Sequence, residues 1–352
     1  MSKFYVFTLR DVKSSPVHAC VFEYEDVLIK SLGAIVISPK DVSTLNLSNA
    51  DNEEIHLFVA GFVIGDIVES LRYLKNHLDR FAGIYGYITD SFLHQSEIDK
   101  PAWRKSISSF YRYTKKITRL FVPFEYSVRE FEDFYKIPVS FIPQAADVLM
   151  FGGATKHKFI DINGYGRQEV NCSQLLSINY NQKNSNRIYH HTDHMRIDRI
   201  NDNHAHRRFF WQLLRGSKIA LAFDALAADN DKRFTQSFIG LRWFESSAAG
   251  CVIVGRRPTC AEMDRFFPLP NSTIELPHNQ KDTLPFFEAL LSDEQSLRSI
   301  GTNNYLYALE KNDWRYRFID MLFILGISPP ASLLEEIAQL SKVREDFIKK
   351  NQ

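Results

Sequence analysis

Two opposite charges lie inside the otherwise apolar segment "SFIGLRWFESSAAGCVIVG", residues 237–255, which has the pattern of a buried helix running into a buried strand. Arg242 and Glu245 are three positions apart, so on a helix they share one face. An intrahelical ion pair would contribute only about 0.2–0.5 kcal/mol, and burying two charges merely to pair them adds little stability. A ligand that carries hydroxyls and phosphates would use both groups. Arg242 and Glu245 are therefore candidate binding residues, with a structural ion pair as the alternative.

Glycines and an arginine form a second candidate, the loop "GYGRQ" that follows a predicted strand at residues 159–163. The glycines, Gly166 among them, allow the backbone to approach a ligand closely, and the guanidinium of Arg167 can donate two parallel hydrogen bonds to a phosphate. An ordinary surface turn is the alternative. Ser237 is predicted to cap a helix over residues 237–248, whose free N–H groups and dipole favour a bound anion. Both observations predict a site for a phosphate-bearing ligand.

Five of the eleven histidines fall within residues 190–206, in the segment "IYHHTDHMRIDRINDNHAH". Histidine and aspartate are both metal ligands, so a metal site is one interpretation. Adjacent histidines on a strand face opposite sides, as His190 and His191 would, and the sequence has no HExxH motif. We therefore expect no catalytic metal here, and we expect His191 and Thr192 to contact the ligand by hydrogen bonds.

Two groups in the first half of the chain could accept a proton from a substrate hydroxyl. His18 lies in the loop "RDVKSSPVHAC", which follows the first predicted strand, and Asp90 ends another strand in "YITDSF". A histidine or a carboxylate in such a position suits a general base. For Asp90, capping of the following helix is the alternative. The sequence thus gives two candidate catalytic residues, His18 and Asp90.

Runs of aromatic and β-branched residues alternate with helical patterns through the whole chain, which is typical of parallel sheets built from βαβ units. The pattern stops at a linker near residue 150, with Gly152 and Gly153, and then starts again. The sequence therefore predicts two doubly wound, Rossmann-like α/β domains. Because such sheets bind ligands at the carboxyl ends of their strands, we expect the two domains to face each other across a cleft that holds the site. The predicted strands are residues 4–8, 34–38, 55–60, 83–89, 119–122, 139–142, 159–163, 187–191, 218–223, 251–255 and 273–276.

The overall composition limits the class of protein. The 352 residues, of which 45% are hydrophobic, suffice for two folded domains and argue against a disordered chain. The formal net charge of +1 gives no global attraction to nucleic acid or to an anionic membrane. The four cysteines show no CxxC spacing, the first residues are unlike a signal peptide, and no segment approaches the roughly 20 apolar residues that span a bilayer. We therefore predict a cytoplasmic protein without a nucleic-acid partner.

Three segments of the second half resemble glycosyltransferases of the GT-B fold, which use nucleotide-sugar donors. "IDINGYGRQ" resembles the first strand and glycine-arginine loop of their donor domain. "GLRWFESSAAGCVIVG" resembles their donor helix and strand, and "LSDEQSLRSIGTNNYLYALEKNDWRYRFIDML" resembles their closing helices. The match covers residues 159–325, whereas over residues 1–150 only the architecture is similar.

The resemblance implies that Glu245 binds the ribose hydroxyls of the donor, and that Arg167 and Arg242 face its diphosphate. Arginine and helix N–H groups would stabilise the leaving diphosphate without an obligatory metal, so no cofactor is expected. Retaining members often carry a second glutamate eight positions earlier, and that position is Ser237 here. The stereochemical outcome is therefore left open, and His18 or Asp90 would deprotonate the acceptor if the enzyme inverts.

With the resemblance included, the sequence predicts a glycosyltransferase that acts on a glycan or glycolipid acceptor in bacterial surface polysaccharide assembly. Its acceptor-side domain is predicted at residues 1–150, its donor domain at 151–325, and an amphipathic C-terminal helix at 326–352. That helix is expected to pack on the protein, with peripheral contact at the inner face of the membrane as the alternative. Two other functions stay open: a sugar-nucleotide epimerase or hydrolase of the same fold, and a non-catalytic nucleotide-binding subunit of a glycan-assembly complex.

Overall fold

The computed structural model describes residues 2–47, 54–90, 107–166, 168–191, 202–227 and 236–351. The chain divides into two compact units, and each is an α/β structure with one parallel sheet. Unit 1 comprises Met1–Pro143, Ile200–Asn203 and Arg315–Ile337, and unit 2 comprises Gln144–Arg199, His204–Trp314 and Ala338–Gln352. The α/β fold class with two doubly wound sheets, as predicted from the sequence, is confirmed. The predicted cleft between the domains stays a prediction.

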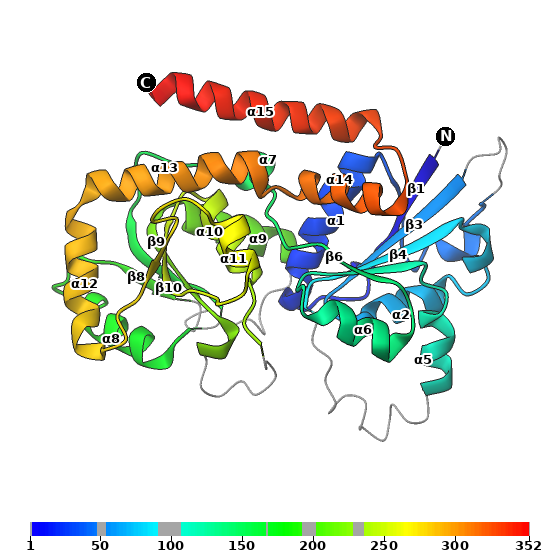
Figure 1. Cartoon of the computed structure of the whole chain (residues 1–352), viewed down its shortest axis with the longest axis horizontal. Helices are drawn as coiled ribbons and strands as arrows, with labels where there is room; N and C mark the ends of the chain where they lie inside the picture. Colours follow the sequence, from blue (N-terminus) through cyan, green and yellow to red (C-terminus); the bar gives the residue numbers. More distant parts are fainter. Residues whose placement is uncertain are drawn as a thin grey trace. The chain divides into compact units, whose positions relative to one another are not determined.

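The sheet of unit 1 has its strands in the order β2-β1-β3-β4-β5-β6, all parallel. β3 and β4 lie in the middle and bury almost every side chain, as expected of strands covered by helices on both faces. In Figure 1, α2, α5 and α6 lie on one face, and α1 and α14 lie on the other. The strands are β1 Ser2–Phe7, β2 Ile35–Ile37, β3 Glu54–Gly61, β4 Gly83–Ile88, β5 Arg119–Val122 and β6 Val139–Phe141, and the helices are α1 Ala19–Leu32, α2 Ile64–Tyr73, α5 Ile107–Thr114, α6 Ser127–Tyr135 and α14 Trp314–Leu325.

The sheet of unit 2 has the order β11-β10-β9-β7-β8, again all parallel. α8 and α12 pack on one face through a core that includes Leu176, Ile219 and Phe287. The strands are β7 Ile160–Gly164, β8 Tyr189–His191, β9 Ser217–Phe223, β10 Val252–Arg256 and β11 Thr273–Glu275, and the helices are α7 Val148–Phe151, α8 Val170–Tyr180, α9 Asn203–Arg215, α10 Leu241–Ala248, α11 Glu262–Phe266, α12 Gln280–Ser292, α13 Glu294–Lys311 and α15 Ala331–Asn351.

In both sheets the second and third strands of the chain lie on opposite sides of the first strand. After β1 the chain adds β2 on one side and β3 on the other, and after β7 it adds β8 on one side and β9 on the other. Such an arrangement leaves a crevice at the carboxyl ends of the two central strands, where ligands bind in doubly wound folds. The segments that follow β1 and β3 in unit 1, and those that follow β7 and β9 in unit 2, are therefore the expected ligand positions.

The C-terminal part of the chain departs from the predicted domain boundaries. α14 and the start of α15 belong to unit 1, whereas the sequence placed residues 151–325 together in the donor domain. The reason lies at Tyr24 of α1, whose ring meets Phe318 edge to face with centroids 5.5 Å apart. The Tyr24 hydroxyl also donates to the sulfur of Met321 at 3.7 Å. α14 thus covers an apolar surface of α1 that unit 1 would otherwise expose.

Candidate functional site

The glycine turn after β7 is tied to the first turns of α10. The Tyr165 hydroxyl donates to the carbonyl oxygen of Arg242 at 3.0 Å, and the Arg242 guanidinium carbon lies 5.3 Å from the centre of the Tyr165 ring. Gly166 adopts a left-handed φ of 64°, and a Cβ at this position would collide with Nη2 of Arg242. The left-handed φ favours glycine here, and the structure places Gly166 beside Arg242; their role in a ligand site stays a prediction.

α10 begins later than the sequence predicted. Its first residue is Leu241 and its N-cap is Gly240, which has no side chain to cap the helix. The predicted cap, Ser237, is wrong: its hydroxyl donates to Oδ2 of Asp224 at 2.5 Å and accepts from the N–H of Thr259 at 2.8 Å. The Ser237 hydroxyl, which would have capped the helix, is thus hydrogen-bonded to the buried carboxylate of Asp224 after β9. The N-terminus of α10, with Arg242 in its first turn, has N–H groups and a guanidinium of the kind that bind anions.

Glu245 is buried, and its carboxylate lies next to an arginine that the sequence analysis missed. Its carboxylate lies 2.5 Å from Nη2 of Arg207, on α9. The Arg207 guanidinium also lies over the ring of Phe210, 4.5 Å from its centre. The ion pair therefore joins two helices, whereas the alternative considered from the sequence was a pair with Arg242 inside one helix. Arg207 is visible in the sequence, but its partner depends on tertiary packing.

The predicted contact residues near β8 are only partly described. His191 is buried, and its ring stacks on that of Tyr189 with centroids 5.2 Å apart. Nδ1 of His190 lies 3.1 Å from Oδ1 of Asn163 on β7. Arg167 and Thr192 lie outside the described residues. Within the described part of the chain no three histidine, cysteine, aspartate or glutamate side chains are arranged to hold a metal ion, and the expectation of a metal-independent site stays a prediction.

A cavity of about 790 Å³ lies at the carboxyl ends of β9, β10 and β11. Asp224 lies in its wall, and burial raises the pKa of this carboxyl despite the hydrogen bonds from Ser237 and neighbouring N–H groups. Two arginines at the end of β10 also line it, and both are engaged: Arg256 donates to the carbonyl oxygen of Pro277 at 3.2 Å, and Arg257 to Oδ1 of Asp264 at 2.6 Å. The sequence analysis did not name Asp224, Arg256 or Arg257. The pair "RR" after a predicted strand was the available signal.

In unit 1, His18 lies beside a carboxylate that the sequence analysis also missed. Its Nε2 is 3.6 Å from Oδ2 of Asp66, and its ring stacks on that of Phe22 with centroids 6.1 Å apart. The His18 side chain is only 16% exposed, and its Nδ1 is buried without a hydrogen-bonding partner among the described residues. The ring is thus held at Nε2 by the carboxylate of Asp66, and Nδ1 is the nitrogen without a partner among the described residues.

Asp66 is fixed in the first turn of α2. Its Oδ2 accepts hydrogen bonds from the N–H groups of Phe62 and Val63 at 2.8 and 3.2 Å, and its Oδ1 lies 3.3 Å from Nζ of Lys13. Burial by itself would raise the pKa of this carboxyl, but the hydrogen bonds from His18 and Val63 and the charge of Lys13 bring the pKa below its usual value. Asp66 is therefore ionised at neutral pH and can stabilise a protonated His18.

Asp90 lies two residues after β4, next to the same loop. Its N–H donates to the carbonyl oxygen of Phe62 at 3.0 Å, and the Phe62 ring meets the His18 ring edge to face at 6.4 Å. The structure therefore brings the two predicted catalytic residues, His18 and Asp90, to one loop at the carboxyl edge of the first sheet. The predicted capping role of Asp90 concerns residues 91–106, which lie outside the described part of the chain.

A buried network anchors the loop that leads to His18. Oε2 of Glu25 accepts from the Thr8 hydroxyl at 2.6 Å and from Nε of Arg10 at 3.1 Å. Burial raises the pKa of Glu25 to about 7, although Arg10 and Thr8 act in the opposite direction. Arg10 also donates to the carbonyl oxygen of Phe22 at 2.6 Å. Thr8 and Arg10, which precede His18 in the chain, are thus hydrogen-bonded to residues of α1, which follow it.

Comparisons with known proteins give a likeness at the level of structure. No protein-family model matches the chain, and no curated protein does. Among solved structures, TarM is similar with a TM-score of 0.48 and 15% identity over 76% of this chain and 54% of that chain. A point mutant of S. aureus TarM in complex with fondaparinux, alpha-GlcNAc-glycerol and UDP gives 0.47 and 16% over the same shares. WaaG, a glycosyltransferase involved in lipopolysaccharide biosynthesis, gives 0.48 and 11% over 92% of this chain and 100% of its own.

The chain spans about half the length of the TarM chains, 54% of each. Among the described helices, none has the length and apolar character that crossing a bilayer requires.

Proposed function

We propose that the chain is a glycosyltransferase that moves a sugar from a nucleotide-sugar donor to a glycan or lipid-linked saccharide. The observation that carries the proposal is the contact between Gly166 and Arg242 at the N-terminus of α10. A glycine turn, an arginine and the uncapped first turn of a helix form a site for a phosphate-bearing ligand at the carboxyl edge of a doubly wound sheet. A diphosphate is the anion that such a donor carries.

The nucleoside of the donor would occupy the cavity at the ends of β9, β10 and β11. Asp224 and Thr259 line that cavity, and both are hydrogen-bonded to Ser237, four residues before α10. The cavity and the N-terminus of α10 are therefore connected along one edge of the sheet. A volume of about 790 Å³ lies in the range of small-ligand sites, about 300–1,000 Å³.

Glu245 would accept hydrogen bonds from the ribose hydroxyls of the donor. Its carboxylate is paired with Arg207 in a buried place, and the oxygens of a carboxylate are hydrogen-bond acceptors. Arg167, in the same loop as Gly166, would add a second guanidinium for the diphosphate. No metal or other cofactor is proposed, because the guanidinium groups and the helix N–H groups would stabilise the leaving diphosphate.

For an inverting transfer, unit 1 would supply the general base. The acceptor hydroxyl would lose its proton to the His18 imidazole as its oxygen bonds to the anomeric carbon, and the bond from that carbon to the diphosphate oxygen would break with its electron pair leaving on the nucleotide. Asp66, 3.6 Å from Nε2, would stabilise the imidazolium that forms. We place this reaction in the cytoplasm, in surface polysaccharide assembly, with contact at the inner face of the membrane as part of the proposal.

Turnover of a panel of nucleotide sugars, with and without glycan and lipid-linked acceptors, tests the proposal. Release of nucleoside diphosphate that depends on an acceptor, with a new glycosidic product, supports a transferase. Release without an acceptor identifies a hydrolase, and epimerised donor identifies an epimerase. Tight nucleotide binding without turnover in any combination favours a binding subunit, and each of these last three results overturns the proposal.

A further inference from the structure

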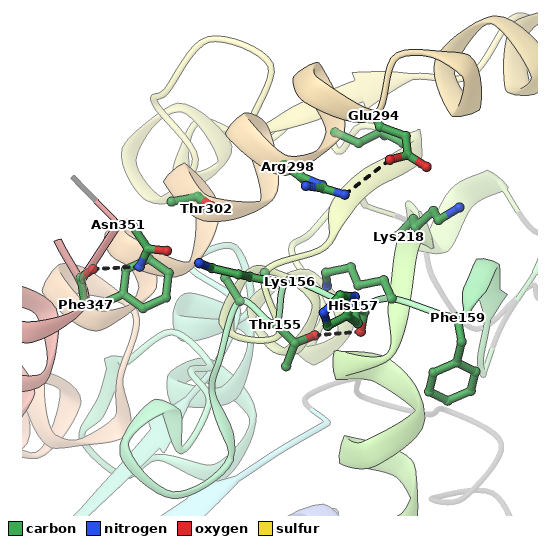
Figure 2. A pocket seen from close by; sticks show the side chains of 14 residues that line it. Thr155, Lys156, His157, Phe159, Lys218, Glu294, Arg298, Thr302, Phe347 and Asn351 are labelled. Carbon is green, nitrogen blue, oxygen red and sulfur yellow. Dashed lines mark hydrogen bonds and ion pairs between the residues drawn. The ribbon is translucent and has the colours of Figure 1, made fainter. Parts of the chain in front are cut away.

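A second cavity, of about 530 Å³, lies at the opposite edge of the sheet in unit 2. Its walls come from the segment before β7, the start of β9, the first turns of α13 and the end of α15 (Figure 2). The strands are parallel, so their amino ends lie at one edge and their carboxyl ends at the other. β9 has seven residues, and at about 3.3 Å each the two edges are roughly 20 Å apart. The cavity is therefore separate from the proposed donor site.

The cavity carries a surplus of positive charge. Lys156, Lys218 and Arg298 line it together with His157, against one carboxylate, Glu294. Within the described parts of the chain, no hydrogen bond or ion pair engages the side chains of Lys156 and His157. Figure 2 shows these two side chains below Arg298.

The remaining two cations of the wall have partners of unequal strength. Arg298 meets Glu294 at 3.2 Å, but both side chains are more than 60% exposed, so this pair holds Arg298 weakly. Lys218 lies 2.8 Å from Oδ1 of Asp161, which fixes its position at the start of β9. Lys156, His157 and Arg298 are thus the side chains that can contact a bound anion.

A half-buried lysine fixes the floor of the cavity by hydrogen bonds. Nζ of Lys158 donates to the carbonyl oxygens of Arg215, Ser217 and Ala249 at 3.2, 2.8 and 3.2 Å. Two of these carbonyls lie at the C-terminal ends of α9 and α10, where a cation is favourable. Lys158 therefore holds the segment before β7 in place and is not itself available to a ligand. The cavity is preformed.

The ends of the cavity carry aromatic rings. Phe159 lies at one end and is 64% exposed, and Phe347 lies at the other, where it packs edge to face on Tyr305 at 5.1 Å. The hydroxyl of Thr302 and the amide of Asn351 add hydrogen-bonding groups. An apolar ring face beside cations and polar groups suits a sugar ring that bears an anionic substituent, because the C–H face of the sugar packs on the aromatic ring.

We propose that this cavity binds a phosphorylated or carboxylated sugar, at a site distinct from the carboxyl edge of the sheet. The anion lies among Lys156, His157 and Arg298, and the sugar ring packs on Phe159. This assignment depends on the cavity alone and holds whether or not the chain transfers sugars. The ligand is either a free sugar phosphate or an acidic residue of a glycan, and the two carry the same recognition chemistry.

Calorimetric titration of the full chain with glucose 6-phosphate, glucuronate, inorganic phosphate and glucose tests the proposal. We expect both anionic sugars to bind more tightly than phosphate or glucose, and the tighter of the two identifies the source of the ligand. Lys156→Gln and Arg298→Gln should each weaken that binding roughly 3- to 10-fold. Both side chains are exposed, so the variants should fold as the wild type does, and Lys183→Gln, at an exposed lysine of the same unit outside the cavity, is the matched control.

The Phe159→Ala variant distinguishes recognition of the sugar ring from recognition of the anionic group. It should weaken the binding of glucose 6-phosphate and leave that of inorganic phosphate unchanged. Equal affinity of glucose and glucose 6-phosphate, or wild-type affinity in the Lys156→Gln/Arg298→Gln double variant, would overturn the site. Phosphate binding as tightly as glucose 6-phosphate, with no effect of Phe159→Ala, would overturn the assignment to a sugar.

Discussion

Nε2 of His18 lies 3.6 Å from Oδ2 of Asp66, and the same carboxylate oxygen accepts two backbone N–H groups from the loop after β3. The histidine comes from the loop after β1, so the pair joins the two strands between which the first sheet reverses its order. A carboxylate held by the backbone cannot turn away from the imidazole, and it fixes which ring nitrogen faces the carboxylate. This pair gives the clearest catalytic expectation.

Replacing His18 by Ala should lower kcat by about 10²- to 10⁴-fold, the usual contribution of a general base. Asp66→Asn should lower kcat by a smaller factor and change the pH profile of kcat, because the amide cannot stabilise an imidazolium by its charge. Binding of nucleoside diphosphate, which we assign to unit 2, should stay unchanged in both. Steady-state kinetics with calorimetry check this, and His77→Asn, at the amino edge of the same sheet, is the control. Wild-type kcat in His18→Ala would remove the base from unit 1.

Glu245→Ala should weaken nucleotide binding by roughly 10- to 100-fold if the carboxylate accepts ribose hydroxyls, since charge-assisted hydrogen bonds contribute about 1.5–3 kcal/mol each. Glu245→Gln should be milder because its amide oxygen still accepts one bond. The ion pair with Arg207 adds a second effect: losing one partner of a buried pair costs stability.

Arg207→Met distinguishes the two roles of Glu245, because it removes the ion pair and leaves the carboxylate. A purely structural Glu245 predicts lower Tm in both variants and equal nucleotide affinity in the molecules that stay folded. Isothermal titration beside a melting curve decides between the roles. Equal affinity in folded Glu245→Ala would remove this residue from the donor site.

Gly166→Ala should weaken nucleotide binding, because the added Cβ collides with Nη2 of Arg242 and displaces the guanidinium. Its left-handed φ of 64° adds a conformational cost of about 1–2 kcal/mol. Gly326→Ala is a matched control, since Gly326 has a φ of 68° and open space around its Cβ position. Both variants should lose stability, and only Gly166→Ala should lose affinity. Equal affinities in the two variants would argue against Arg242 as a ligand.

Glu25 should make unit 1 less stable as the pH rises from about 4.5 to 7. Burial raises its pKa from 4.5 to about 7 in the folded protein, so folding favours the protonated form. The favourable contribution is complete below the unfolded pKa and is lost as the pH rises through the folded pKa, by about 3 kcal/mol in total. Glu25→Gln should remove this dependence, while Glu130→Gln, at an exposed glutamate, should keep it. Tm measured across this pH range checks the sign, and a Tm of wild type that rises relative to Glu25→Gln would contradict it.

Activity should survive EDTA, because we assign stabilisation of the leaving diphosphate to arginine and helix N–H groups. Elemental analysis of the purified protein should find less than one metal ion per chain. Loss of turnover on chelation, restored by a single divalent ion, would instead show that a metal takes part.

The strands were predictable because parallel strands covered on both faces read as continuous apolar runs, as β3 and β9 do. The start of α10 was not predictable, because the hydroxyl of Ser237 is hydrogen-bonded to Asp224, thirteen residues earlier in the chain. Arg207 and Asp66 were missed for a similar reason. Each acts through a partner on another element, Glu245 and His18 respectively, and no local pattern marks such a pair. Gly166 and Arg242 could be named as candidates because glycine in a loop and a charge in an apolar helix are visible without the fold.

The return of Arg315–Ile337 to unit 1 has a consequence for synthesis of the chain. The Ser31 hydroxyl donates to Oε2 of Glu336 at 2.6 Å, and Tyr24 packs on Phe318, so this face of α1 is covered by residues that are translated long after the sheet of unit 1. At about 5–20 residues per second, the ribosome needs roughly 10–40 s to travel from residue 143 to residue 337. During that interval the sheet of unit 1 is complete while one of its helices still exposes an apolar surface. Unit 1, whose sheet is translated before unit 2, is therefore completed after most of unit 2 has been made, and a fragment ending at residue 143 should require a chaperone or aggregate.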